Sequence, residues 1–178
     1  MIGHNRGPSL DGGASWRKTC WAKARKDLLP HLPIEVLRGR LKRAAELGLD
    51  YRTYAGIRAC TGQDVVAVLF SSNALGMHLG SLNPTRVSQL GQVKATRIGL
   101  AAPPLAPARM LVAPLHAAFC APRVHASFAQ TRAAVRAALG RVPSDQALLI
   151  GAFAPEADWV SAARLAGYVD AARFFART

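Results

Sequence analysis

Apolar residues recur at helical spacing through the first third of the chain. Between residues 15 and 29 an apolar or small side chain returns at every fourth position, which predicts a helix. A second helix is predicted over residues 33–47, where apolar residues share one face and Gly48 follows as a stop. Asp50 can cap a third helix that runs to about residue 59. The N-terminal third is therefore expected to be helical.

The next segment, QDVVAVLFSSNALG, contains an uninterrupted apolar run followed by polar residues. The Val-rich run predicts a buried strand that ends in a polar loop at Ser71–Asn73. The same apolar residues also fit one face of a helix capped by Asp64, and this alternative stays open.

From residue 84 onward helical and strand patterns alternate. Helices are predicted over 84–93, 108–120, 126–139 and 155–176, and strands over 96–101 and 146–153. Alternation of this kind predicts an α/β fold with layered helices and a small, mostly parallel sheet. We expect it to be preceded by a flexible N-terminal arm and a basic helical segment. The predicted organisation is an arm over 1–14, a basic helical segment over 15–62 and an α/β domain over 63–178.

The C-terminal segment AARLAGYVDAARFFA has two interpretations. It is similar to the second helix-turn-helix of AraC-type transcription regulators at Ala163, Gly167, Tyr168, Asp170 and Phe174. That resemblance implies a turn at the glycine and a helix that enters the DNA major groove. We favour one long amphipathic helix, because proline and acidic residues stand at its start and arginines at its end.

The main feature of the composition is a large excess of positive charge. The 178 residues are 51% hydrophobic, which is enough for a packed domain, and 23 Lys and Arg against 10 Asp and Glu give a net charge of +13. Twelve of the basic residues lie within the first 60 positions. A basic surface suits nucleic acid or an acidic protein, although an arginine-rich composition also produces a merely well-solvated surface.

The basic residues of the predicted N-terminal helices are interleaved with Trp16, Trp21, Tyr51 and Tyr54. Cationic side chains neutralise phosphates, and aromatic rings can stack on bases, although such rings are more often part of a core. The candidate phosphate contacts are Arg17, Lys18, Lys23, Arg25, Lys26, Arg38, Arg40, Lys42, Arg43 and Arg52.

The chain opens with MIGHNRGPSLDGG, which lacks the strand and the Lys-Ser/Thr pair of a phosphate loop. At Gly3, His4, Asn5, Gly7 and Pro8 it resembles small bacterial proteins that begin with a GHN-x-GP segment. Because that segment precedes different domains in those proteins, the resemblance implies a docking element rather than an enzymatic activity.

Two further groups of residues are candidates for chemistry. His116, Cys120 and His125 have a spacing that could hold zinc on a helix, but a buried cysteine with surface histidines is the simpler interpretation. We therefore predict no metal and no cofactor. Ser71–Asn73 would lie at the carboxyl end of a strand, where α/β proteins bind ligands, yet no G-x-S-x-G surrounds these serines.

These observations favour a non-catalytic regulatory or nucleic-acid-associated protein that uses its basic N-terminal helices for phosphate contacts. The alternative is an adaptor that docks an acidic protein through the arm and these helices. A third possibility is a small-ligand enzyme with a site near Ser71–Asn73. Three widely spaced cysteines, with no signal peptide or membrane span recognisable, predict a cytoplasmic location.

Overall fold

The computed structural model describes Cys20 and residues 32–77 and 83–176, and divides the chain into two compact units, Met1–Arg38 and Gly39–Thr178. The predicted arm over 1–14 lies outside the described residues. So does the predicted helix over 15–29, apart from Cys20, which is helical and exposed. The architecture below is that of the second unit, together with the first residues of the helix that leads into it.

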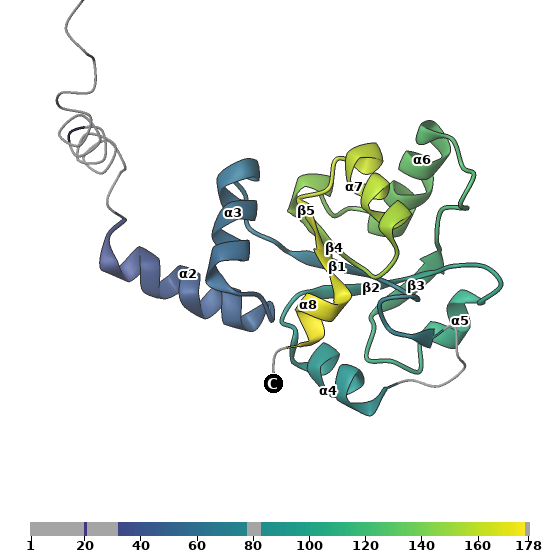
Figure 1. Cartoon of the computed structure of the whole chain (residues 1–178), viewed down its shortest axis with the longest axis horizontal. Coiled ribbons are helices and arrows are strands. Elements are labelled where there is room, and N and C mark those ends of the chain that lie inside the picture. Colours follow the sequence, from purple (N-terminus) through teal and green to yellow (C-terminus); the bar gives the residue numbers. More distant parts are fainter. Residues whose placement is uncertain (1–19, 21–31, 78–82, 177–178) are drawn as a thin grey trace, which may run out of the picture. The chain divides into compact units, whose positions relative to one another are not determined.

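Five parallel strands form the centre of the second unit (Figure 1). They are β1 (Ala67–Ser71), β2 (Thr96–Ala101), β3 (Ala117–Cys120), β4 (Ala147–Gly151) and β5 (Gly167–Asp170). Their order across the sheet is β3-β2-β1-β4-β5, and every neighbouring pair is parallel. The α/β fold with a parallel sheet is therefore confirmed.

The central strands explain why the sequence shows continuous apolar runs rather than alternation. Every residue of β1 and of β4 is buried, as expected for parallel strands that are covered on both faces. Alternate residues of β1 contribute to two separate cores, because successive side chains point to opposite faces of a sheet. Val68 and Phe70 lie in one core, and Ala67 and Leu69 lie in the other.

Helices cover both faces of this sheet. They are α2 (Ile34–Glu46), α3 (Tyr51–Thr61), α4 (Pro84–Gln92), α5 (Pro107–Met110), α6 (Phe128–Leu139), α7 (Asp158–Ala163) and α8 (Ala171–Phe175). The core on one face takes side chains from the end of α2 and from α3, α4, α5 and α8, and the opposite core takes them from α6 and α7. Figure 1 shows α6 and α7 on one side of the sheet and α4, α5 and α8 on the other.

The connections change face in the middle of the sheet. The chain passes from β1 to β2 through α4 and from β2 to β3 through α5, both on the first face. It then crosses to β4 through α6 and continues to β5 through α7, both on the second face. The direction of strand order thus reverses between β1 and β4, which is the topological switch point of a doubly wound sheet.

The predicted helix after Asp50 is confirmed together with its end signals. The Asp50 carboxylate accepts the backbone N–H of Thr53 at 2.6 Å, and Tyr54 and Ile57 are buried. Gly62 ends the helix with φ 71°, a left-handed conformation that glycine adopts without strain. The strand predicted over 96–101 and the helices predicted over 33–47, 84–93 and 126–139 are also present.

The helix predicted over 108–120 is wrong. The structure has the four-residue helix α5 there, and residues 117–120 form β3. Pro114 lacks the backbone N–H that a continuing helix needs and its ring clashes with the preceding turn, which explains why α5 stops short.

The long helix predicted over 155–176 is also wrong, and so is the helix-turn-helix resemblance at its end. A 3-10 turn, η3 (Ala154–Ala157), leads into α7, and Arg164 ends α7 in a left-handed conformation with φ 57°. The chain then forms β5 beside β4, with Ala166 N–H donating to the Ala147 carbonyl at 2.9 Å. Pairing with β4, to which Tyr168 and Val169 are well suited, outweighs the local helical spacing.

Candidate functional site

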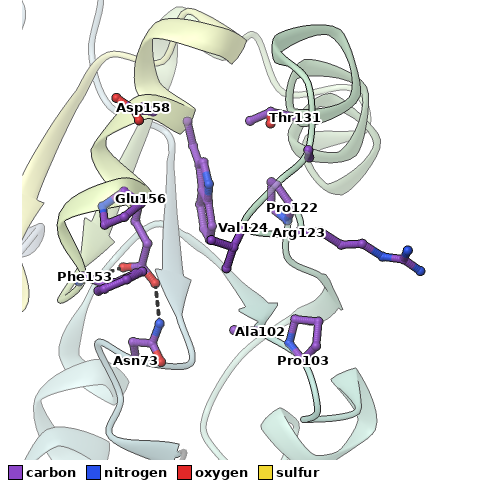
Figure 2. A pocket seen from close by; sticks show the side chains of 13 residues that line it. Asn73, Ala102, Pro103, Pro122, Arg123, Val124, Thr131, Phe153, Glu156 and Asp158 are labelled. Carbon is purple, nitrogen blue, oxygen red and sulfur yellow. Dashed lines mark hydrogen bonds between the residues drawn. The ribbon is translucent and has the colours of Figure 1, made fainter.

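A pocket of about 500 Å³ lies at the carboxyl edge of the sheet (Figure 2). Its wall combines residues from the segments that follow β1, β2, β3 and β4 with one residue of α6 and two of α7. The lining residues are Asn73, Ala102, Pro103, Pro122, Arg123, Val124, Ala126, Thr131, Phe153, Pro155, Glu156, Asp158 and Trp159. This is the position at which doubly wound folds bind ligands, because loops from both crossovers diverge there.

The most unusual residue of the wall is Glu156, which is only 1% exposed. Its Oε2 atom accepts hydrogen bonds from Ser71 Oγ at 2.9 Å and from the backbone N–H of Ala152 at 2.9 Å and of Phe153 at 3.3 Å. Its Oε1 atom accepts one from Asn73 Nδ2 at 2.8 Å. Four donors on one carboxylate, two of them side chains at and just after the end of β1, join the carboxyl ends of β1 and β4.

The last residue of β4 is a glycine for a steric reason. A Cβ atom on Gly151 would lie 2.6 Å from Glu156 Oε2 and 2.6 Å from Cε2 of Tyr168. Both distances are shorter than real Cβ contacts, so any larger residue would displace the carboxylate, the ring or the backbone. Gly151 thus permits Glu156 to lie over the end of β4.

Tyr168 is affected by the same carboxylate. Its pKa is raised above the usual value of 10, first by burial and then by the negative charges of Glu156 and Asp170. Burial and neighbouring negative charge both disfavour the phenolate. The phenol therefore stays neutral in the folded protein at pH values where a free tyrosine begins to ionise.

The predicted site at Ser71–Asn73 lies at this edge, but its three side chains have different surroundings. Ser71 is fully buried and its Oγ also accepts the backbone N–H of Ala74 at 3.0 Å. Ser72 is 2% exposed, and its Oγ accepts the backbone N–H of Ala102 at 3.0 Å, which ties the end of β1 to β2. Asn73 alone of the three lines the pocket.

The rest of the wall is largely apolar. Trp159 is 9% exposed, whereas Phe153 is 48% exposed and Val124 is 74% exposed at the rim. Asp158 adds a second, exposed carboxylate. Arg123 is the one cationic residue in this wall, and Figure 2 shows its side chain directed away from Glu156.

The candidate phosphate contacts are only partly within the described residues. Arg17, Lys18, Lys23, Arg25 and Lys26 lie outside them, as do the candidate docking residues Gly3, His4, Asn5, Gly7 and Pro8. On α2 and α3, Lys42 and Arg52 are exposed and Arg40 is partly buried. Arg38 is exposed and pairs with Glu35 at 2.9 Å. Phosphate contact by these residues remains a prediction.

Arg43 has contacts inside the fold. Its Nε donates to Asp64 Oδ2 at 2.9 Å, its Nη2 to the Val65 carbonyl at 2.7 Å and its Nη1 to the Lys94 carbonyl at 3.0 Å. Asp64 also accepts from Tyr54 Oη at 2.9 Å, so the guanidinium links α2 and α3 to the chain before β1. Most of its donors are therefore already used within the protein.

The residues considered for zinc do not share a helix. Cys120 ends β3, and four residues of a strand span about 13 Å, so the spacing from His116 no longer places both side chains together. His116 Nδ1 instead accepts the backbone N–H of Arg97 at 2.9 Å. Within the described ranges, no group of three or more His, Cys, Asp or Glu side chains could hold a metal ion.

Sequence reasoning placed Ser71–Asn73 at the carboxyl end of a strand, as the structure has them, but missed Glu156, which it assigned to the first turn of a helix. The available signal was the glycine that ends the apolar run at Gly151, followed after four residues by an acidic side chain.

In the part of the chain that the structure covers, no helix has the length and apolar character to cross a bilayer. Comparisons with protein-family models, with curated proteins and with solved structures found no significant match.

Proposed function

We propose that this protein binds a small molecule in the pocket at the carboxyl edge of its sheet. The observation that carries the proposal is a cavity of about 500 Å³ formed by the loops after β1, β2, β3 and β4, where strand order reverses. Its size falls within the range of about 300–1,000 Å³ that is usual for ligand sites. A mostly apolar wall with a few convergent polar groups is also typical of such sites.

The backbone donors at this edge argue against a phosphate-bearing ligand held by the loops after β1 and β4. In dinucleotide-binding proteins such donors are free to contact the pyrophosphate. Here the N–H of Ala74 bonds to Ser71, and the N–H groups of Ala152 and Phe153 bond to Glu156. The chain thus satisfies with its own side chains the groups that would otherwise receive phosphate.

The surroundings of the serines favour binding over nucleophilic catalysis. A nucleophilic hydroxyl must reach the substrate and needs a base that takes its proton. The hydroxyls of Ser71 and Ser72 are buried and hold the ends of β1, β2 and β4 together. We therefore propose a binding site, with the partly buried Asn73 and the buried Glu156 as its polar wall.

The test is a small-molecule screen against the full chain by thermal shift, with hits followed by ¹H–¹⁵N NMR. Ala126→Trp places an indole in the pocket wall, and Ala59→Trp is the matched control on an exposed position of α3. Hits should lose affinity in Ala126→Trp and keep it in Ala59→Trp. A screen without hits, or hits that Ala126→Trp does not affect, would refute the proposed function.

Nucleic-acid association is a second candidate, because the net charge is +13 and Lys42 and Arg52 are exposed on the helices where contact was predicted. Binding of generic duplex DNA should weaken steeply with salt. It should be lost in Arg38→Glu/Lys42→Glu/Arg52→Glu but kept in Arg109→Glu/Arg136→Glu/Arg141→Glu, a control with the same charge change at exposed arginines. Absence of binding at low salt would reject this candidate.

The adaptor hypothesis depends on the segment over residues 1–14, which lies outside the described residues. We propose it only as an alternative. It predicts one specific acidic protein partner that is lost when this segment is deleted, while the pocket remains intact.

A further inference from the structure

We infer that the ligand of this pocket carries a positive charge, as an organic amine or amidinium with an apolar body. The inference rests on the proposed function and concerns the class of molecule that the same site accepts. Its basis is the environment of the Glu156 carboxylate, considered together with the walls around it.

Glu156 is a buried carboxylate whose donors are all neutral. They are one hydroxyl, one side-chain amide and two backbone N–H groups. In the described part of the chain, no Lys or Arg forms an ion pair with Glu156, although this protein carries an excess of cations. Buried charges are usually paired, and opposite charges attract more strongly away from water. A cationic ligand would supply the partner that the fold leaves out.

The two carboxylate oxygens are not equally used. Oε2 accepts three hydrogen bonds, whereas Oε1 accepts one, from Asn73. A carboxylate oxygen offers about two lone-pair directions, so the three donors on Oε2 share them, with Phe153 N–H the most distant at 3.3 Å, whereas Oε1 has one direction left for a further donor. Glu156 and Asn73 both line the pocket, and Figure 2 shows their hydrogen bond at its wall. An ammonium or amidinium N–H is the donor that gains most from an ionised acceptor.

The remaining walls suit the rest of such a molecule. Phe153 and Trp159 provide aromatic surface, and aromatic faces attract cations as well as apolar groups. Asp158 adds a second negative charge at an exposed position. The pocket wall therefore carries two carboxylates against the single guanidinium of Arg123, whose side chain is directed away from Glu156.

The experiment compares three phenyl compounds of similar size on the full chain. They are phenethylamine, 2-phenylethanol and 3-phenylpropionate, which are cationic, neutral and anionic at pH 7. In a Trp16→Phe/Trp21→Phe background, Trp159 in the pocket wall is the only tryptophan, so its fluorescence reports binding directly. The amine should bind at least about tenfold more tightly than the other two, because a hydrogen bond to a charged group contributes roughly 1.5–3 kcal/mol and 1.4 kcal/mol is tenfold in affinity.

Three variants assign this preference to residues. Glu156→Gln should reduce the advantage of the amine about tenfold and leave 2-phenylethanol unaffected, since a neutral acceptor forms the weaker bond. Asp158→Asn should reduce the advantage of the amine severalfold. Because this variant leaves the hydrogen bonds of Glu156 intact, it tests the charge preference even if Glu156→Gln fails to fold. Asp145→Asn, at an exposed position outside the pocket wall, is the matched control and should change nothing.

The outcomes separate this inference from the proposed function. If 2-phenylethanol or 3-phenylpropionate binds in the pocket as tightly as the amine, and Ala126→Trp abolishes binding, the pocket is a ligand site but the charge preference is overturned. An unchanged amine preference in both Glu156→Gln and Asp158→Asn also overturns it. If the amine does not bind at millimolar concentration the inference fails, while the proposed function fails only if the wider screen is empty too.

Discussion

Truncation of Glu156 to alanine tests whether this carboxylate holds the carboxyl ends of β1 and β4 together. The variant removes the acceptor for four donors at once. Asn73 lines the pocket and can turn its amide to water, so the donors that lose their acceptor are the buried Ser71 hydroxyl and the part-buried backbone N–H groups of Ala152 and Phe153.

The expected cost follows from these three donors. Each hydrogen bond to a charged group contributes roughly 1.5–3 kcal/mol, but water entering the enlarged pocket recovers part of the loss. We therefore expect Glu156→Ala to lower the free energy of unfolding by about 3–5 kcal/mol, a large part of the roughly 5–15 kcal/mol of a typical domain. In Glu156→Gln the amide oxygen can accept from the same three donors if Asn73 turns its own oxygen towards the new NH₂ group. That variant should lose only about 1 kcal/mol.

Urea denaturation followed by far-UV circular dichroism measures both values, with an unchanged m-value as the sign that the same cooperative unit unfolds. Asp158→Ala, at the exposed neighbouring carboxylate, is the control and should stay within about 0.5 kcal/mol of wild type. A loss below about 1 kcal/mol in Glu156→Ala, or an equal loss in the alanine and glutamine variants, would contradict the role assigned to the carboxylate.

Three further outcomes are expected. Gly151→Ala should lower the free energy of unfolding by about 1–3 kcal/mol, because the new Cβ meets Glu156 and Tyr168. Gly56→Ala on α3 has nothing within 4 Å of its Cβ and should raise the free energy of unfolding by about 0.5–1 kcal/mol. Thermal unfolding of both variants checks these opposite signs. The pKa of Tyr168 is raised in the folded state, so its contribution to stability is complete below the unfolded pKa of about 10 and is lost as the pH rises through the folded value. Tyr168→Phe should flatten the loss of stability between about pH 9 and 11, and an unchanged pH profile would exclude this contribution. Arg43→Ala should lower the free energy of unfolding by about 2–4 kcal/mol, because it removes the guanidinium that donates to Asp64 Oδ2 and to two carbonyls. Arg38→Ala breaks only an exposed ion pair and should cost at most about 0.5 kcal/mol, so equal effects of the two variants in chemical denaturation would contradict this assignment.

Local pattern predicted the elements whose ends carry their own signals. The helix after Asp50 has a capping carboxylate at one end and Gly62 at the other, and the strand over 96–101 ends in four buried residues without a polar side chain. The segment over 155–176 failed because its small and apolar residues fit a helix as well as a short strand. Only pairing with β4, through contacts that no local window contains, selects the strand at Gly167–Asp170.

The residues of the candidate site also differ in whether local sequence could predict their position. Ser71–Asn73 could be placed at the carboxyl edge of the sheet because they lie at the end of a buried apolar run. Glu156 could not be connected with them, since that requires knowing that β1 and β4 are neighbours and that η3 turns the side chain back over Gly151. Likewise, Arg43 resembles any other basic residue of its helix until Asp64 and the Lys94 carbonyl are seen beside it.

The hydrogen bond between Ser71 and Glu156 joins residues that are 85 positions apart in the chain. During synthesis, the residues of β1, β2 and β3 are made long before those of η3, so the Ser71 hydroxyl at first lacks its acceptor Glu156. Closing so long a loop costs entropy, and the pairing of Ala67 in β1 with Ala147 in β4 closes one of nearly the same length, so the strand pair and the hydrogen bond share that cost. A molecule that binds this pocket only in the folded state would therefore stabilise the junction of β1 and β4 as well, and the apparent stability of the domain would rise with its concentration.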